Sequence, residues 1–168
     1  LKVVFLRSGD RSGALKSLKN ADLIVTSYSL LVRDFAALEP LKFRTLIIDE
    51  AQYVKNHQAK TYSCVRRLHA DCRIALTGTP MENSTLELWA LHSIVTPGLF
   101  GDPKWFRERY QLPIEREANA DVLARLRRRI RPFILRRTKE HVEKELPPKV
   151  EQTLMLELPP AQRRVYDL

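Results

Sequence analysis

A short aliphatic run that ends in two carboxylates constrains the fold of this chain more than any other stretch. Residues 45–48 read Thr-Leu-Ile-Ile, which is typical of a fully buried strand of a parallel sheet, and Asp49 and Glu50 follow where such a strand ends. Open α/β sheets bind ligands at that end, where Asp49 could hold a hydrated Mg²⁺ and Glu50 could aim its carboxylate at an attacking water. The alternative for the pair taken alone is a solvated acidic turn, because most turns are polar.

A second apolar run follows the first and also ends in a polar turn. Residues 73–77 read Arg-Ile-Ala-Leu-Thr, and residues 78–83 supply the turn. Between the two runs, residues 56–68 place apolar side chains at helical spacing, which predicts an amphipathic helix. The order strand, helix, strand predicts a βαβ unit and a parallel sheet, so both polar turns are expected at one edge of that sheet.

After residue 83 the pattern becomes helical. Ser84 and Glu87 have the spacing of a capping box, which opens a helix that Pro97 and Gly98 end. An N-cap at residue 102 and a proline at residue 103 predict a second helix over 104–110, and a third is predicted over 120–130. The sequence therefore predicts an α/β sheet followed by a helical segment.

The composition favours a polyanionic partner. The 168 residues carry 29 Lys and Arg against 20 Asp and Glu, a formal charge of +9, which suits nucleic acid. No apolar run approaches the length of a membrane span, so we expect a cytoplasmic protein without membrane contact.

Cys64 and Cys72 lack the Cys-x₂-Cys spacing of zinc sites, which predicts two unligated thiols in a reducing compartment.

Three longer stretches carry a family resemblance. Residues 47–52 read Ile-Ile-Asp-Glu-Ala-Gln, residues 75–83 read Ala-Leu-Thr-Gly-Thr-Pro-Met-Glu-Asn, and residues 132–139 read Pro-Phe-Ile-Leu-Arg-Arg-Thr-Lys. In order and spacing they resemble the second motif, the third motif and the basic brace of the SWI/SNF-like branch of superfamily-two helicase-type ATPases. The resemblance covers nearly the whole chain. It implies an α/β fold with a RecA-like parallel sheet, part of a P-loop NTPase lobe, and an α-helical insertion.

The resemblance also implies a division of the chain. Residues 1–84 would be the C-terminal part of the first RecA-like lobe, 85–130 a helical protrusion, 131–148 the basic brace and linker, and 149–168 the start of the second lobe. Gly9, Gly13 and Lys16 do not fit the phosphate-binding pattern Gly-x₄-Gly-Lys-Ser/Thr. We therefore expect a fragment of a longer ATPase, without the phosphate loop or the arginine finger and inactive alone.

Catalytic roles follow from the resemblance residue by residue. Asp49 would hold Mg²⁺ through water, Glu50 would orient and deprotonate the attacking water, and Gln52 would sense the γ-phosphate of ATP. Thr77, Gly78 and Thr79 would relay the nucleotide state to the grip on DNA. ATP and Mg²⁺ are thus the expected cofactors.

Nucleic-acid contacts are predicted in three further stretches. Thr26, Ser27 and Tyr28 match a motif that contacts the phosphate backbone, although capping of the following helix explains the Thr-Ser pair equally well. Contacts are also assigned to Lys55 and Asn56 and to Arg127, Arg128 and Arg129, for which the alternative is a solvated basic helix face. Arg136 and Arg137 would form the brace between the two lobes.

The predicted function is therefore part of an ATP-dependent double-stranded DNA translocase that remodels chromatin or other protein–DNA complexes. Its compartment would be the bacterial nucleoid or the eukaryotic nucleus, and DNA-bound protein complexes would be further partners. One alternative is an RNA helicase of the Asp-Glu-Ala-Asp type, although Gln52 replaces the final Asp. A non-catalytic basic nucleic-acid-binding adaptor is the alternative from another functional class.

Overall fold

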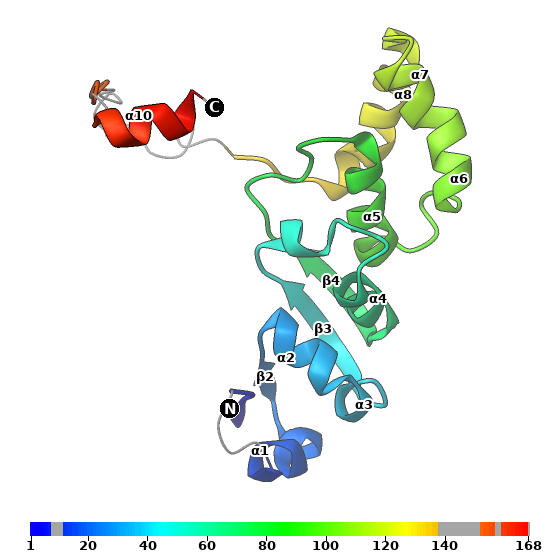
Figure 1. Ribbon diagram of the computed structural model, residues 1–168. Coiled ribbons are helices and arrows are strands. Elements are labelled where there is room, and N and C mark those ends of the chain that lie inside the picture. The colour runs from blue at the N-terminus through cyan, green and yellow to red at the C-terminus, as the bar shows by residue number, and fades with distance from the viewer. Residues whose placement is uncertain (8–11, 138–151, 157–158, 168) are drawn as a thin grey trace. The chain divides into compact units, whose positions relative to one another are not determined.

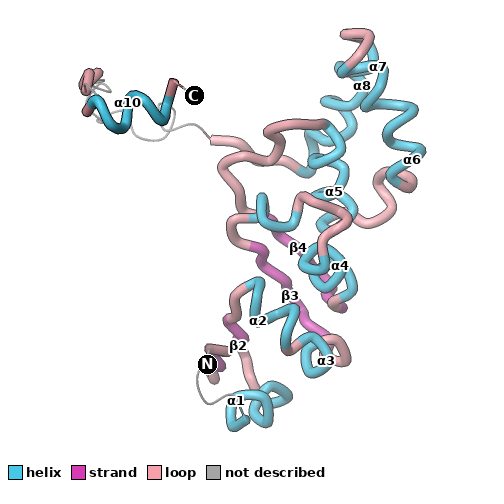
Figure 2. Tube along the Cα trace, in the orientation of Figure 1, coloured by secondary structure: helices cyan, strands magenta, loops and turns pink. Residues whose placement is uncertain are grey.

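The computed structural model describes residues 1–7, 12–137, 152–156 and 159–167 (Figure 1). The chain forms two compact units, Leu1–Phe133 and Ile134–Leu168. All the strands of the described ranges belong to the first unit, and Figure 2 shows them as two separate pairs. The predicted α/β class with parallel strands is confirmed.

Both strand pairs are parallel, and a helical connection joins the strands of each pair. In the first pair, β1 (Val3–Phe5) lies beside β2 (Leu23–Val25), with α1 (Ser12–Ser17) between them in sequence. In the second pair, β3 (Lys42–Ile48) lies beside β4 (His69–Ala75), with α4 (Lys60–Arg67) between them. The predicted strand–helix–strand order of this unit is therefore confirmed. The two pairs are linked by α2 (Tyr28–Arg33) and α3 (Phe35–Leu38).

Within the described part of the chain, the β3–β4 pair is covered on one face only, so the prediction of a fully buried strand is wrong. Ile48 is buried, whereas Ile47, whose side chain points to the opposite face, is 60% exposed and its partner Ile74 is 42% exposed. The covered face meets the helices that follow the strands: the Arg73 guanidinium donates hydrogen bonds to the carbonyls of Leu68 and Ile94, at 2.6 and 3.2 Å. Parallel sheets bury both faces only when helices cover both.

The helical segment begins with α5 (Thr85–Val95) and ends with α8 (Ala120–Ile130). Between them, α6 (Pro103–Phe106), a π-helical turn (Arg107–Gln111) and α7 (Leu112–Glu115) follow one another without a break. The helix predicted over 104–110 is therefore longer than expected. Pro113 has no N–H to bond to the preceding turn and its ring crowds the carbonyl four residues earlier, and a wider turn accommodates both effects.

The start of α5 differs in one respect from the predicted capping box. Ser84 caps the helix as expected, because its hydroxyl accepts a hydrogen bond from the Leu86 N–H at 3.0 Å. Glu87, however, accepts from the N–H groups of Glu82 and Asn83, at 2.8 and 3.3 Å, and so reaches past the cap residue. Glu87 therefore fixes the segment that follows β4 in addition to the helix start.

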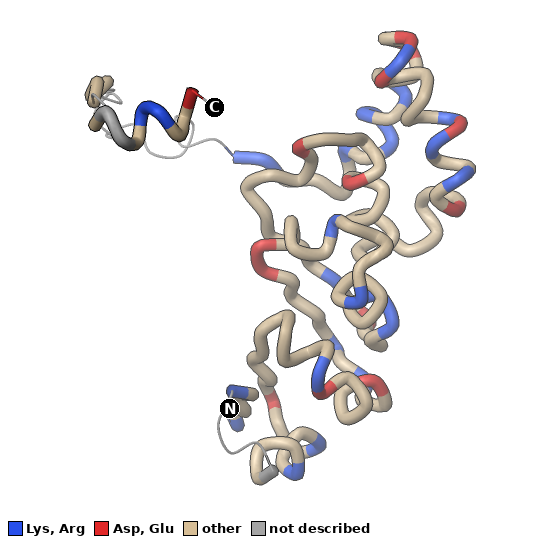
Figure 3. Tube along the Cα trace, viewed as in Figure 1, with Lys and Arg blue, Asp and Glu red and all other residues tan. Residues whose placement is uncertain are grey.

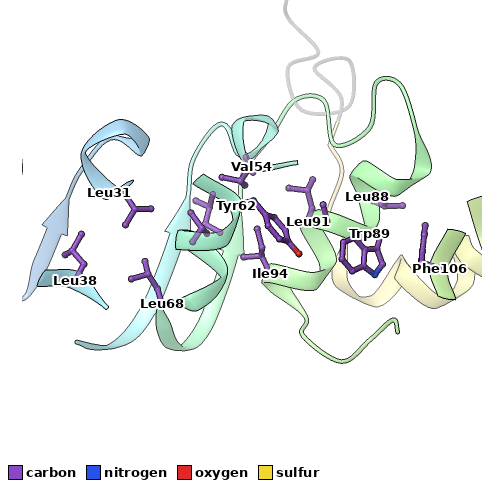
Figure 4. Close-up of a cluster of buried hydrophobic side chains, with 14 of the residues drawn as sticks. Leu31, Leu38, Val54, Tyr62, Leu68, Leu88, Trp89, Leu91, Ile94 and Phe106 are labelled. Atoms are coloured by element: carbon purple, nitrogen blue, oxygen red, sulfur yellow. The ribbon is translucent and has the colours of Figure 1, made fainter. Parts of the chain in front are cut away.

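The core of the first unit is a single cluster of buried side chains that extends from Leu6 to Leu126. Figure 4 shows α5 at its centre, where this helix contributes Leu88, Trp89, Leu91 and Ile94. Phe106 is fully buried, and its ring centroid lies 5.0 Å from that of Phe100. The helical segment thus shares one core with the βαβ unit, which makes it a fixed part of the first unit.

The second unit contains α10 (Pro160–Tyr166). Residues 152–156, in the segment predicted to start the second lobe, do not form a strand. Within the brace and linker predicted over residues 131–148, residues 138–148 lie outside the described residues. The predicted domain boundaries stay predictions.

None of the helices in the described ranges combines the length and apolar character needed to cross a membrane.

Candidate active site

The polar segments that follow β3 and β4 are held side by side by backbone hydrogen bonds. The Leu76 N–H donates to the carbonyl of Ile48 at 2.8 Å, and the Ala51 N–H donates to the carbonyl of Leu76 at 2.9 Å. These bonds extend the contact between the strands past the last paired residues. The carboxylates after β3 and the threonines after β4 therefore share one edge of the sheet, as the sequence predicts.

A chain of side-chain hydrogen bonds joins the two segments. The Gln52 amide donates from Nε2 to Oε2 of Glu50 at 2.8 Å, and its Oε1 accepts from the Thr77 hydroxyl at 2.9 Å. The Thr77 hydroxyl oxygen accepts in turn from the backbone N–H of Thr79 at 3.1 Å. Gly78 lies between the two threonines, and a Cβ atom there would have no neighbour within 4 Å among the described residues. The geometry thus connects Glu50, Gln52, Thr77 and Thr79.

The backbone at Glu50 has an uncommon conformation. Its φ and ψ are 48° and 51°, in the left-handed region that side chains other than Gly, Asn and Asp seldom adopt. This conformation costs roughly 1–2 kcal/mol for an L-residue. The Glu50 N–H donates to Oδ1 of Asp49 at 2.9 Å, so the side chain of one carboxylate residue fixes the backbone of the other. Such strain persists only where neighbouring contacts enforce it.

Tyr28 lies next to this turn. Its phenol hydroxyl donates to the backbone carbonyl of Asp49 at 2.6 Å, and its ring centroid is 5.8 Å from that of Tyr53. Burial, followed by the nearby charges of Asp49 and Glu50, raises the pKa of Tyr28 to about 12. The hydroxyl therefore keeps its proton and remains a donor at physiological pH.

Asp49 suits a hydrated magnesium ion. Mg²⁺ in nucleotide sites keeps several waters and takes one or two carboxylates together with the phosphates of the substrate. One oxygen of Asp49 accepts a backbone hydrogen bond, which orients the carboxylate and leaves the other oxygen available. Within the described ranges, no group of three or more His, Cys, Asp or Glu forms a cage for a metal. The free oxygen of the Asp49 carboxylate therefore fits Mg²⁺ bound together with a nucleotide.

Lys55 lies in an ion-pair cluster. Its ammonium is 2.5 Å from Oε2 of Glu82 and 3.4 Å from Oε2 of Glu87. The hydrogen bond to Glu82 is the largest factor that raises the pKa of Lys55, and Glu87 adds to it. Asn56, the other residue assigned to nucleic acid in this stretch, accepts from the N–H of Gln58 at 3.0 Å. The structure thus places both residues in local contacts, and their predicted contact with nucleic acid stays a prediction.

The segment after β2 shows the capping that the sequence allows. The Ser27 hydroxyl accepts from the N–H of Leu30 at 3.4 Å and is the N-cap of α2. Thr26 and Ser27 are both exposed, so a cap and a contact with a phosphate backbone are compatible here. The hydroxyl of Tyr28 differs from both, because it points to the backbone of Asp49.

Lys and Arg residues are spread over the described part of the first unit, including α1, α4 and α8 (Figure 3). Arg127 and Arg128 on α8 are exposed. Arg129 is also exposed, but its guanidinium donates to the carbonyl of Leu99 at 2.6 Å and lies 5.4 Å from the Phe100 ring centroid. Arg136 and Arg137 are exposed and belong to the second unit, and their predicted role as a brace stays a prediction.

One residue of structural importance has no signal in the sequence. The Glu115 carboxylate accepts from both the N–H and the hydroxyl of Thr85, at 2.7 and 2.8 Å, and from the Gln111 amide at 3.1 Å. It thus caps α5 from a helix thirty residues away. Glu87 was visible as half of a capping pattern, but a cap supplied across the fold has no sequence pattern of its own.

Comparisons with known proteins agree on one family. The family model described as the SNF2-related domain matches residues 1–168. TATA-binding protein-associated factor MOT1 of Saccharomyces cerevisiae is 38% identical over 179 residues, which cover 99% of this chain and 10% of that protein. Chromatin-remodeling ATPase INO80 of Neurospora crassa is 39% identical over 150 residues, which cover 86% of this chain and 9% of that protein.

A solved structure gives the same result. The Sulfolobus solfataricus SWI2/SNF2 ATPase core in complex with double-stranded DNA matches with a TM-score of 0.77 and 36% identity, over 99% of this chain and 35% of that chain. The chain thus spans about a third of this solved core and about a tenth of the length of the two curated relatives.

Proposed function

Because this chain belongs to the SNF2-related family, we propose that it forms part of the ATPase core of a motor that translocates on double-stranded DNA. The observation that carries the proposal is the hydrogen-bond chain from Glu50 through Gln52 to Thr77. It connects a carboxylate that can act on water with the segment after the neighbouring strand. A site that must both hydrolyse a nucleotide and report its state needs such a connection.

Each residue of the site then has a chemical task. Asp49 would hold Mg²⁺, which when bound neutralises phosphate charge in the reaction. Glu50 would orient the attacking water and take its proton, since its carboxylate is held at Oε2 by Gln52 and keeps its other oxygen for the water. Gln52 would sense the γ-phosphate of ATP through the same amide. Thr77, Gly78 and Thr79 would pass the change to the DNA-binding surface.

Double-stranded DNA is the proposed partner. The solved relative was captured with double-stranded DNA, and the formal charge of +9 on this chain favours a polyanion. The names of the curated relatives refer to chromatin remodelling and to a TATA-binding protein, which supports protein–DNA complexes as the target. We accordingly place the protein where DNA is held, in the nucleoid of a bacterium or the nucleus of a eukaryote.

The test is ATP hydrolysis by a protein that contains this chain together with the rest of the ATPase core. Phosphate release should rise when double-stranded DNA is added. Glu50→Gln should abolish turnover but retain nucleotide and DNA binding, because the amide fills the same space and cannot take the proton of water. The exposed Glu117 provides the matched control, and Glu117→Gln should behave like the wild type.

Two results would count against the proposal. Turnover of Glu50→Gln near the wild-type rate would remove the water-activating role. DNA-stimulated phosphate release by residues 1–168 alone would also contradict it, because this sequence lacks the Gly-x₄-Gly-Lys-Ser/Thr loop that cradles phosphates.

A further inference from the structure

The peptide group between Asp49 and Glu50 is fixed at both of its polar ends. Its carbonyl accepts from the Tyr28 hydroxyl at 2.6 Å, and its N–H donates to Oδ1 of Asp49 at 2.9 Å. A peptide group is planar, so these two bonds together set its rotation. Rotation of this plane is the same motion that changes φ of Glu50, which stands at 48°.

The left-handed conformation of Glu50 therefore depends on a partner from another element. The bond from Asp49 is local and would move with the turn, whereas the Tyr28 hydroxyl comes from the first residue of α2, 21 positions earlier. Strained backbone persists only where surrounding contacts over-determine it. Among the described residues, the Tyr28 bond is the non-local side-chain contact on this peptide group.

We propose that the Tyr28 hydroxyl is a positioning group that holds Glu50 in its left-handed conformation and so aims the carboxylate at the reacting water. The inference rests on the proposed function for the role of Glu50, and goes beyond it in assigning Tyr28. It also changes the task of Tyr28, which the motif resemblance assigns to nucleic acid. The backbone of Glu50 is held from Tyr28 and its carboxylate from Gln52, so two separate contacts fix its two ends.

The test compares two tyrosines whose rings are in contact. Tyr28→Phe removes one hydroxyl and keeps the ring beside Tyr53. Tyr53→Phe is the matched control, since that side chain is 68% exposed and its hydroxyl has no hydrogen-bond partner in the described part of the chain. Both variants are made in the protein that contains the rest of the ATPase core. The measurements are kcat and KM for ATP at saturating DNA, DNA affinity, and hydrogen exchange of the peptides that cover residues 48–54.

Tyr28→Phe should lower kcat about fivefold, which is the contribution of one neutral hydrogen bond of typical strength. KM for ATP and DNA affinity should stay within about twofold of the wild type, because the hydroxyl contacts neither ligand in this proposal. Hydrogen exchange in residues 48–54 should be faster than in the wild type. Tyr53→Phe should change none of these quantities.

Other outcomes would overturn the inference and are distinct from failure of the proposed function. Unchanged kcat and unchanged exchange in Tyr28→Phe, with an active wild type, would remove the positioning role. Weaker DNA binding of Tyr28→Phe with an unchanged kcat at saturating DNA would indicate that Tyr28 contacts nucleic acid instead. A wild type without DNA-stimulated hydrolysis would end the proposed function, and the exchange measurement alone would then decide whether Tyr28 holds the turn.

Discussion

The substitution Lys55→Gln tests whether the Lys55 side chain contacts nucleic acid or has a structural role. Lys55 is predicted from the sequence to contact nucleic acid, whereas the structure places its ammonium between Glu82 and Glu87. Both the Lys55 and the Glu87 side chains are largely covered, at 15% and 16% exposed, and Glu82 is 47% exposed. A covered ammonium in an acidic cluster is a poor partner for a DNA phosphate, so we expect the structural role.

The expected loss of stability in Lys55→Gln follows from these exposed fractions. Solvent screens the pair with Glu82, and we assign it no stabilising contribution. The pair with Glu87 is at 3.4 Å and better covered, which places it near the upper end for such pairs, at about 1 kcal/mol. For a chain of this size a loss of 1 kcal/mol lowers Tm by about 2–4 °C. Glu87 also accepts hydrogen bonds from the N–H groups of Glu82 and Asn83, and these bonds should limit the loss of stability in Lys55→Gln.

The assay combines thermal unfolding with the salt dependence of DNA binding. Lys55→Gln should lower Tm by about 2–4 °C and leave the slope of log affinity against log salt unchanged. Lys60→Gln on the exposed face of α4 is the control, and its Tm should match the wild type. A decrease of about 0.9 in the salt slope with an unchanged Tm would refute the reasoning, because it would mean that Lys55 binds a phosphate.

Three other outcomes are expected. Thr77→Val should lower basal ATP hydrolysis more than Thr79→Ala, since the first removes a hydroxyl from the hydrogen-bond chain and the second keeps its backbone N–H. Replacing Arg127 and Arg128 by Gln should reduce the salt slope of DNA binding by about 0.9 each, because both side chains are exposed and can contact phosphates, and an unchanged slope would indicate a solvated helix face. Burial disfavours the charge of Glu115, yet hydrogen-bond donors at the start of α5 hold its pKa below the usual value. Glu115→Gln should therefore lower the free energy of unfolding by its full amount at neutral pH. The difference from the wild type should vanish as pH falls through the lowered pKa of Glu115.

Much of the βαβ unit is predictable because its signals are local. The aliphatic runs, the helical spacing of residues 56–68 and the polar turns together predict β3, α4 and β4 in order. The adjacency of Asp49 and Thr77 follows from the parallel arrangement, in which both strand ends meet one edge of the sheet. The strand ends were less predictable: β4 begins at His69, four residues before the predicted start, because pairing with β3 extends it.

The remaining features depend on contacts that no local pattern encodes. The left-handed backbone of Glu50 opposes the preference of that residue type and exists because the fold supplies the Tyr28 hydroxyl. The cap that Glu115 provides to α5 joins residues that are far apart in sequence. Ile47 and Ile74 read as core residues, yet they are exposed because the helices of the described ranges cover the opposite face of the pair. In each case tertiary context outweighs local propensity.

The two strand pairs differ in length, and this difference sets which pair of the first unit opens first. β1 and β2 have three residues each, whereas β3 and β4 have seven. Pairs as short as the first are marginal, so they belong to the parts of a protein that open with the least free energy. The segment from Thr26 onward follows the weak pair, and Asp49 follows the strong one. Local opening of the β1–β2 pair is therefore expected to reach Tyr28 and its hydrogen bond to the Asp49 carbonyl before the β3–β4 pair opens.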